Sequence, residues 1–414
     1  MSQAKKKYYG RQTELALKHF SIGDEVWSSE VIRALALVKI ASAKTNAKLK
    51  KLDSKRAHAI VKAAHEIVDG KHADQFPLSI WQSGSGTQFN MSVNEVIASR
   101  ANEILTGQAD EKNPIHPNDH VNMSQSTNDT VPTAIHVALL DVFERKLHSY
   151  TAVLLKTLQK KSREFKSLKK IGRTHLQDAV ELSLGDVFSG YAANVEYALK
   201  VIDASATSLY EVPFGGTAVG TGLNTPRGFQ KNAVRELARL SKLPLVPSRN
   251  TFADQSAHVR LVAFSGALKT LAVTLMKIAD DVRLLASGPH AGIGELMLPK
   301  NEPGSSIMPG KVNPTQCEAL IMVAADVIGV DTTLTIAETK LANFEMQAAK
   351  PLFASRLLRA TSTLADAVRS FEMYALRGVQ ANRDRIEINR GHSLEKLTRE
   401  SAVTGFDKAV GKKH

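Results

Sequence analysis

Residues 133–171 read TAIHVALLDVFERKLHSYTAVLLKTLQKKSREFKSLKKI, a run of 39 positions without glycine or proline. Apolar side chains recur in it at helical spacing: Ile135, Ala138, Leu139, Val142, Phe143, Leu147, Tyr150, Leu154 and Leu158. We expect Asn128 or Asp129 to cap this helix and Pro132 to lie in its first turn. A helix of this length spans ~58 Å. Because a compact domain does not easily house such a rod, the run favours an elongated helical bundle.

Further stretches without glycine or proline predict more long helices, at 191–212, 267–287, 330–350 and 352–377. Alternating strand patterns are scarce, and no tandem repeat or low-complexity linker is visible. We therefore expect an all-α fold in three regions. Residues 1–124 should hold short helices and glycine-rich turns, 125–381 the long helices, and 382–414 a short polar C-terminal region. A long apolar-striped helix cannot bury its faces in a thin monomer, so self-association is expected.

The composition is typical of a soluble globular protein, with 43% hydrophobic and 23% charged residues among 414. We find no uninterrupted apolar run of the ~20 residues that a membrane span needs. The formal charge of +13 raises nucleic-acid binding as an alternative. Against it, aromatic residues are sparse, basic residues are spread along the chain, and no zinc-finger spacing occurs. We therefore expect no membrane span. We also expect no specific nucleic-acid binding, because the same positive field would attract a small acidic molecule.

The chain has one cysteine, Cys317, which excludes an intramolecular disulfide and a cysteine-rich metal site. The N-terminal residues MSQAKKK are basic but lack the apolar segment of a signal peptide. These features favour a reducing compartment. We expect the cytoplasm, or the mitochondrial matrix if a transit peptide has been removed.

Residues 304–314, GSSIMPGKVNP, are the most informative short segment of the chain. Pro309 and Gly310 break the hydrogen-bond ladder of a helix, so the segment should be a loop. Its two hydroxyls, one ammonium and one amide suit a small anion. Lys311 would be the point charge, and the hydroxyl and amide groups the orienting donors.

Other segments place small polar side chains beside glycines or at a helix start: 81–88 (WQSGSGTQ), 121–129 (VNMSQSTND) and 171–179 (IGRTHLQDA). Glycine-flanked hydroxyls suit an anion, although most such turns are only turns. His175 is the best acid–base candidate because histidine titrates near neutrality, while a lone histidine in a helical region is usually structural. Residues 214–222, FGGTAVGTG, mimic a phosphate loop. With no strand expected before them, we interpret them as a helix-to-helix turn with close backbone packing.

Together these segments resemble the fumarase/aspartase superfamily, and within it the class II fumarases. The likeness is residue by residue along 304–314 and continues through 315–318 (TQCE). It implies a helical fold in which the central helices of four chains form a twenty-helix core with smaller terminal domains. It also implies reversible anti addition of water to fumarate, giving malate through an aci-carboxylate carbanion. No metal or other cofactor is implied.

The resemblance also implies roles for individual residues. His175, Ser305 and Glu318 match catalytic positions, with Ser305 as the base and Glu318 as the carboxylate that pairs with the histidine. The expected substrate ligands are Ser85, Thr87, Ser126, Thr127, Asn128, Thr174, Ser306, Lys311 and Asn313. His116, Pro117, Asn118 and Asp119 match a secondary dicarboxylate site. Each active site would combine residues of three chains in a homotetramer. A serine base would need its alkoxide stabilised by N–H groups, a lysine or a helix terminus, which the sequence does not show.

Two alternatives remain open at this point. One is aspartate ammonia-lyase, since Thr127 is more typical of aspartases, whereas Gly310 and the run 315–318 favour a fumarase. The other is a catalytically silent relative with a structural or binding role. The chain departs from the family pattern at several positions: Phe89, Glu181, Val187, Met346–Ala348 and an apparent truncation near 405–409.

Overall fold

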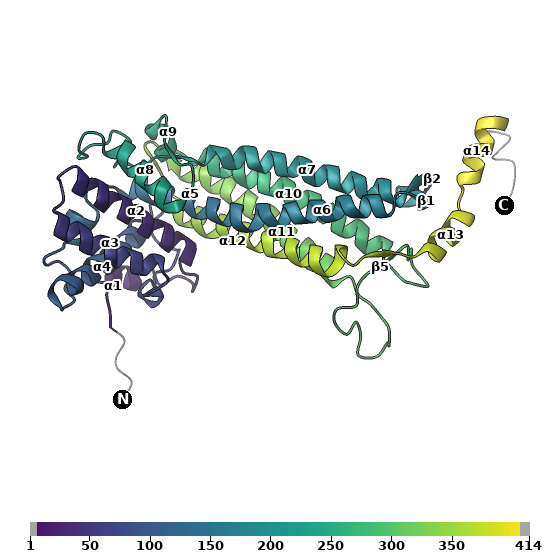
Figure 1. Cartoon of the computed structure of the whole chain (residues 1–414), viewed down its shortest axis with the longest axis horizontal. Helices are drawn as coiled ribbons and strands as arrows, with labels where there is room; N and C mark the ends of the chain where they lie inside the picture. The colour runs from purple at the N-terminus through teal and green to yellow at the C-terminus, as the bar shows by residue number, and fades with distance from the viewer. Residues whose placement is uncertain (1–5, 406–414) are drawn as a thin grey trace. The chain divides into compact units, whose positions relative to one another are not determined.

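The computed structural model describes residues 6–405 and consists mainly of α-helices (Figure 1). Its contacts divide the chain into two compact units. Unit 1 combines Met1–Glu144, Asp203–Ala267 and Gly329–Thr361, and unit 2 combines Arg145–Ile202, Leu268–Ile328 and Ser362–His414. The three sequential regions expected above stay a prediction, and the C-terminal one extends into residues 406–414, outside the described part.

Helix α2 (Ser29–Lys48) is the centre of unit 1. It begins after Ser28, whose side chain accepts a hydrogen bond from the backbone N–H of Val31. Its contacts are with α3 (Ser54–Val68), α4 (Thr87–Thr106), α5 (Thr127–Val142) and α8 (Phe229–Ser241). Small side chains such as Ala34 and Ala41, both at most 2% exposed, let neighbouring helices approach closely.

The helix expected over 133–171 is confirmed for most of its length. Helix α5, the π-helical segment η3 (Phe143–His148) and α6 (Ser149–Glu164) follow one another without a break. Two details were wrong. Ser126, rather than Asn128 or Asp129, is the N-cap, so Pro132 lies beyond the first turn. The last residues of the run belong to a strand, because after Glu164 the chain turns into a β-hairpin.

The other long helices overlap the glycine- and proline-free stretches that predicted them, and each contributes residues to both units. They are α7 (Leu184–Ser208), α10 (Val259–Leu285), α11 (Thr315–Leu341) and α12 (Lys350–Phe371). The prediction of a helix over 330–350 was wrong in its second half, because α11 ends at Leu341 and residues 342–347 form a short β-hairpin. By length and composition alone, α10 and α11 could cross a membrane, which is weak evidence because core helices pass the same test. The most apolar window of α11 is only 33% buried within one chain.

The strands form short two-stranded pairs. In unit 2, β1 (Lys169–Thr174) pairs antiparallel with β2 (Gln177–Ser183), and β5 (Leu296–Met297) with β8 (Gln380–Ala381). In unit 1, β3 (Glu211–Val212) pairs parallel with β4 (Val246–Pro247), and β6 (Ala342–Asn343) antiparallel with β7 (Met346–Gln347). The remaining elements are α1 (Arg11–His19), η1 (Ala73–Gln75), η2 (Pro117–Val121), α9 (Thr251–Ser256), η4 (Glu372–Leu376), α13 (Arg383–Gly391) and α14 (Glu395–Thr404).

Candidate active site

In unit 1, the turn before α4 places three hydroxyls in a chain. Ser83 Oγ lies 2.9 Å from Ser85 Oγ, which lies 2.7 Å from Thr87 Oγ1. Helix α4 begins at Thr87, so these hydroxyls lie at its N-terminus, the end of a helix that attracts anions. Two N–H groups of the first turn already have acceptors: that of Thr87 donates to Ser85 Oγ at 3.3 Å, and that of Phe89 to Gln82 Oε1 at 2.9 Å. Gly84 is required here, because a Cβ at that position would lie 1.5 Å from the carbonyl oxygen of Ala348.

The second polar segment, 121–129, ends in the first turn of α5. Ser126 and Asp129 form a capping box: Ser126 Oγ accepts from the N–H of Asn128, and Asp129 Oδ1 accepts from the N–H of Ser126 at 2.9 Å. The other oxygen of Asp129 accepts from the N–H groups of Gly215 and Thr217. Burial raises the pKa of Asp129 to about 6, and these three N–H donors oppose that rise. Asp129 thus fastens the helix start to the loop 213–222.

Thr127 and Asn128 are both held by neighbouring side chains. Thr127 Oγ1 accepts from Asn90 Nδ2 at 3.1 Å. Asn128 Nδ2 donates to the carbonyl of Ala218 at 2.8 Å, and Asn128 Oδ1 lies 3.4 Å from Lys350 Nζ. Lys350 is fully buried, and burial lowers its pKa to about 8. Because its backbone N–H donates to the carbonyl of Gly84 at 2.9 Å, this lysine connects the turn before α4 with Asn128.

The loop 213–222 packs as closely as its glycines suggested. A Cβ on Gly215, Gly216 or Gly220 would come within 3 Å of a neighbouring residue. The expectation that no strand precedes the loop was wrong, because β3 ends at Val212. Helix α9 covers the loop: Gln255 Nε2 donates to the carbonyl of Thr217, and Thr251 Oγ1 to that of Gly220, both at 2.6 Å.

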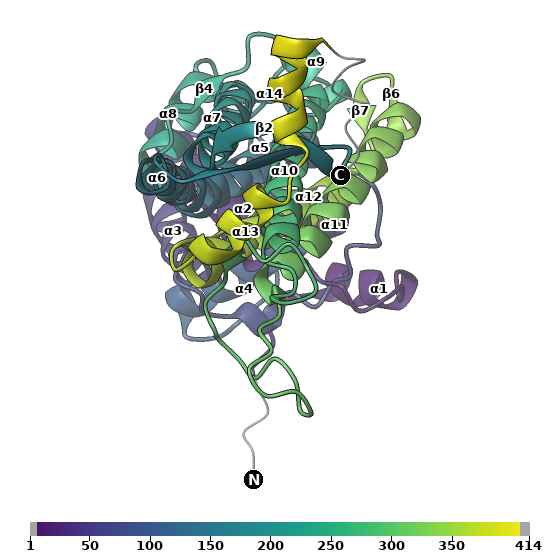
Figure 2. The ribbon, with the colours of Figure 1, turned by 90° about the vertical axis from the view of Figure 1, so that its right-hand side faces the viewer.

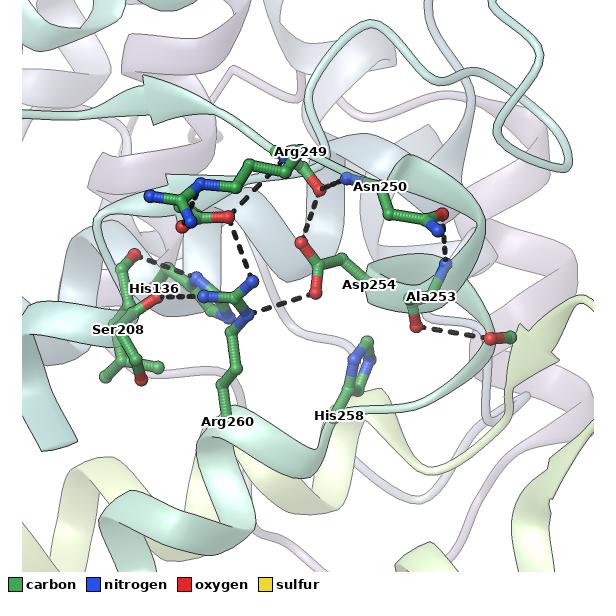
Figure 3. Close-up of polar contacts among 12 residues, drawn as sticks. His136, Ser208, Arg249, Asn250, Ala253, Asp254, His258 and Arg260 are labelled. Carbon is green, nitrogen blue, oxygen red and sulfur yellow. Dashed lines mark hydrogen bonds and ion pairs between the residues drawn. The ribbon is translucent and has the colours of Figure 1, made fainter.

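A polar cluster fixes α9 in turn (Figure 3). The guanidinium of Arg260 contacts Asp254 at 3.1 Å, Glu211 at 2.9 Å and the carbonyl of Ser208 at 2.8 Å. Beside it, the buried His136 ring has its Nδ1 3.0 Å from the carbonyl of Leu209. Hydrogen bonds therefore link Asn128 in α5, through the loop 213–222 and α9, to Arg260 in α10.

In unit 2, His175 lies at the tip of the β1–β2 hairpin rather than in a helical region. Thr174 pairs with Gln177, so His175 and Leu176 form the two-residue loop. Both have left-handed backbones, with φ of 55° and 61°. A tight hairpin loop needs this conformation but favours asparagine and glycine for it. A histidine and a leucine there are strained, which points to a functional role for the tip.

The base of the hairpin is anchored by a buried carboxylate. Glu295 contacts Arg173 at 2.7 Å, Lys170 at 3.2 Å and the amide of Asn389 at 3.0 Å. Burial raises the pKa of Glu295, but its hydrogen bond with Arg173 and the charge of Lys170 outweigh this and hold it below its usual value. Helices α13 and α14 contact the two strands (Figure 2). Glu181, a departure from the family pattern, forms a 2.8 Å ion pair with Arg390.

Residues 304–314 are non-helical, as predicted, and α11 begins directly after them. Asn313 Nδ2 donates to the carbonyl of Gly304 at 2.6 Å, which closes the loop at its base. Ser305 Oγ accepts from the N–H groups of Ile307 and Met308, at 3.2 and 3.1 Å. Two N–H donors on a serine oxygen stabilise negative charge on it, which is the condition that a serine base requires.

The other candidate side chains of unit 2 are exposed to solvent within one chain. Ser306, Lys311 and Glu318 are exposed, and Ile307 at the loop tip is 89% exposed. Within the described residues, neither ring nitrogen of His175 has a hydrogen-bond partner. No hydrogen bond there joins the hairpin tip to Ser305 or Glu318. The predicted pairing of His175 with Glu318 is thus not made inside unit 2.

The segment 116–119 belongs to unit 1 and begins the π-helical turn η2. His116 Nδ1 accepts from the N–H groups of Asn118 and Asp119, both at 3.2 Å. Pro117 is buried, while Asn118 and Asp119 are exposed. The assignment of a secondary dicarboxylate site to these four residues stays a prediction.

Comparison with known proteins identifies the family. A family profile, described as lyase, matches residues 1–329. The chain belongs to the fumarase/aspartase family of lyases. This lyase is 50% identical over 403 residues to the class II fumarate hydratase of Thermosynechococcus vestitus, covering 97% of this chain and 86% of the relative. It is 49% identical over 406 residues to the mitochondrial fumarate hydratase of Rattus norvegicus, covering 98% and 80%.

The fold agrees as well. A class II fumarase structure from Schistosoma mansoni superposes on this lyase with a TM-score of 0.95 and 39% identity, covering 99% of this chain and 88% of that one. The predicted fumarase-like helical fold is therefore confirmed.

Sequence reasoning missed several buried side chains that support the candidate residues, among them Lys39, Glu295 and Lys350. Lys350 carried a signal, because a lysine in the first turn of a helix, just before Pro351, opposes the helix dipole. Lys39 and Glu295 carried none, since lysine and glutamate are usually exposed and nothing local marks them as buried.

Proposed function

We propose that this lyase interconverts malate and fumarate by anti elimination and addition of water. The observation that carries the proposal is its identity of about half with class II fumarate hydratases along nearly the whole chain. The two N–H groups on Ser305 Oγ support it, because they supply the stabilisation that the chemistry needs.

In the malate direction, the Ser305 alkoxide takes the proton from the carbon next to one carboxylate. The electron pair of that C–H bond delocalises into the carboxylate, giving an aci-carboxylate carbanion. Lys311, Asn313 and the hydroxyls of Ser85 and Thr87 stabilise the developing charge.

The electron pair then forms the double bond as the hydroxyl leaves the adjacent carbon. Protonated His175 gives its proton to that hydroxyl, so water departs. Glu318 orients the imidazole and stabilises its charged form. Proton exchange with solvent resets Ser305 and His175, and fumarate is released. Ser126, Thr127, Asn128, Thr174 and Ser306 complete the set of proposed substrate contacts.

We further propose a homotetramer in which three chains contribute to each site. The exposed apolar surface of α11 supports this, since Met322 is 68% and Ile336 59% exposed in a helix whose apolar window is mostly uncovered. Contact with other copies of the chain would bury these side chains. His175 from one chain would then meet Ser305 and Glu318 from another.

Purified enzyme tested separately with malate and with aspartate decides the substrate. We expect the ultraviolet absorbance of fumarate to rise with malate, unaffected by a chelator, and not with aspartate. Fumarate from aspartate alone would make the chain an aspartate ammonia-lyase, the activity that Thr127 left open. No product from either substrate would support a non-catalytic role. We place the enzyme in the cytoplasm or, like its relative from Rattus norvegicus, in mitochondria, which cell fractionation tests.

A further inference from the structure

A buried lysine lies behind the proposed substrate segment of unit 1. Lys39, in the middle of α2, is 0% exposed. Its Nζ donates to three amide oxygens: Asn90 Oδ1 at 2.7 Å, Asn122 Oδ1 at 2.9 Å and Gln125 Oε1 at 3.0 Å. An ammonium group has three N–H donors, so the three amides match its full capacity.

No carboxylate contacts this ammonium within the described residues. Burial lowers the pKa of Lys39 to about 7, and the charge of buried Asp129 acts on it only through space. A buried cation whose partners are all neutral is costly, and most buried lysines are paired with a carboxylate. Such an arrangement should have a function that offsets this free-energy cost.

The ammonium group sets the orientation of the three amide groups. The ammonium form of Lys39 can only donate, so each amide must present its oxygen to the lysine and its NH₂ group elsewhere. Asn90 Nδ2 consequently donates to Thr127 Oγ1 at 3.1 Å and to Asn122 Oδ1 at 3.3 Å, and Gln125 Nε2 donates to the carbonyls of Val121 and Met123. Because Thr127 Oγ1 accepts from Asn90, its own hydrogen is left to be donated to another group.

We propose that Lys39 is a positioning residue that fixes the Asn90 amide, so that the Thr127 hydroxyl is presented as a donor to a substrate carboxylate. The inference rests on the proposed role of Thr127 as a substrate ligand. Without the lysine, Asn90 can turn its oxygen to Thr127 and take the hydrogen that the substrate would otherwise receive.

The first variant is Lys39→Met, which keeps the length of the side chain and removes its donors. Losing one hydrogen bond to a charged carboxylate should raise KM for fumarate by about 10-fold. The value of kcat should stay within about 3-fold, because the bond is made equally in the ground and transition states. The matched control is Lys161→Met. Lys161 is also buried but donates to the carbonyl of Val379 in unit 2.

A general effect of losing a buried lysine would lower the melting temperature of both variants and leave KM unchanged in both. A raised KM in Lys39→Met alone supports the inference, and an unchanged KM in a folded Lys39→Met enzyme overturns it.

The second variant, Asn90→Asp, covers the case in which Lys39→Met does not fold. Its carboxylate pairs with Lys39, so folding should be retained, but it offers Thr127 an acceptor in place of an NH₂ donor. We expect KM to rise as in Lys39→Met. A KM equal to that of wild type would overturn the proposal.

Thr127→Val separates this inference from the proposed function. An unchanged KM in Thr127→Val would remove Thr127 from the substrate site, and the inference with it. A raised KM in Thr127→Val together with a normal KM in Asn90→Asp would overturn the inference alone. If both are raised, Asn90→Asp combined with Thr127→Val should be no worse than Thr127→Val, because both remove the same donor. Additive effects would contradict the proposed coupling.

Discussion

The two units carry their candidate residues in opposite ways. In unit 1, Thr127 and Asn128 are hydrogen-bonded by side chains of the same unit, with Lys39 and Lys350 buried behind them. In unit 2, His175 and Ser305 lie at a strained hairpin tip and in a loop whose apex is almost fully exposed. Unit 1 is preorganised within one chain. The candidate groups of unit 2 are exposed within one chain, and in the proposed tetramer another chain would surround them.

This difference follows the division of labour in the proposed reaction. Hydroxyls and amides that bind carboxylates work best in a rigid network, since their geometry sets affinity. The proposed base and acid come instead from segments that are anchored at the base and open at the end. Glu295 holds the base of the hairpin and Asn313 closes the base of the loop. The backbone that carries each proposed reactive side chain is therefore fixed at its base.

The largest expected effect comes from removing the reactive groups of unit 2. Ser305→Ala and His175→Asn should each lower kcat by at least ~100-fold, the scale of positioned acid–base groups. Asparagine tolerates the left-handed backbone, so His175→Asn removes the ring without adding strain at the tip. Steady-state kinetics measure the loss, and circular dichroism checks folding. Normal turnover in Ser305→Ala would exclude that residue as the base. Glu318→Gln should be milder, since the proposed role of Glu318 is to orient the histidine and stabilise its charged form rather than to transfer a proton.

Mixed assembly tests whether unit 2 is completed by another chain. Inactive Ser305→Ala and His175→Asn proteins are unfolded together in equal amounts and refolded. If the two residues of a site come from different chains, random assembly leaves roughly a quarter of the sites intact. Activity should therefore recover to about a quarter of the wild-type value. The control is the same mixture without unfolding. Mixed tetramers that stay inactive would show that each chain supplies both groups.

The contrast between the units also explains what the sequence could predict. Helical periodicity is local, so the helix over 133–171 could be predicted without knowing its neighbours. The loop 304–314 was equally clear, because Pro309 and Gly310 act on their own backbone. The β1–β2 hairpin was missed because the buried partner of its base, Glu295, lies more than a hundred residues away along the chain. Lys39 was missed because burial depends on tertiary packing. Lys350 was missed although its place before Pro351, in the first turn of α12, is unfavourable for an exposed lysine.

Acid should weaken unit 1 through His136. Burial lowers the pKa of His136 to about 4 in the folded protein, against an ordinary value of 6.5. Between these values the unfolded chain binds more protons, so stability falls as the pH drops from 6.5 towards 4. This contribution amounts to about 2 kcal/mol at pH 5. Urea unfolding at pH 7 and pH 5, at one protein concentration, should show a smaller loss for His136→Asn. Equal losses would mean that His136 is not held neutral by burial.

The smallest effect on stability and turnover is expected for Gly310→Ala, in the exposed loop of unit 2. Gly84→Ala, in the packed turn of unit 1, is the comparison. Gly310 has a φ of 82° with nothing within 4 Å of an added Cβ, so Gly310→Ala should cost only ~1 kcal/mol. That strain falls on a loop, so the melting temperature should hardly change, while kcat falls less than ~10-fold because Lys311 shifts. Gly84→Ala should lower the melting temperature clearly, since its Cβ would meet backbone 1.5 Å away. Thermal unfolding and kinetics of both variants decide. Equal losses of melting temperature would mean that the loop is as tightly packed as the turn, and the contrast between the units would fail at this point.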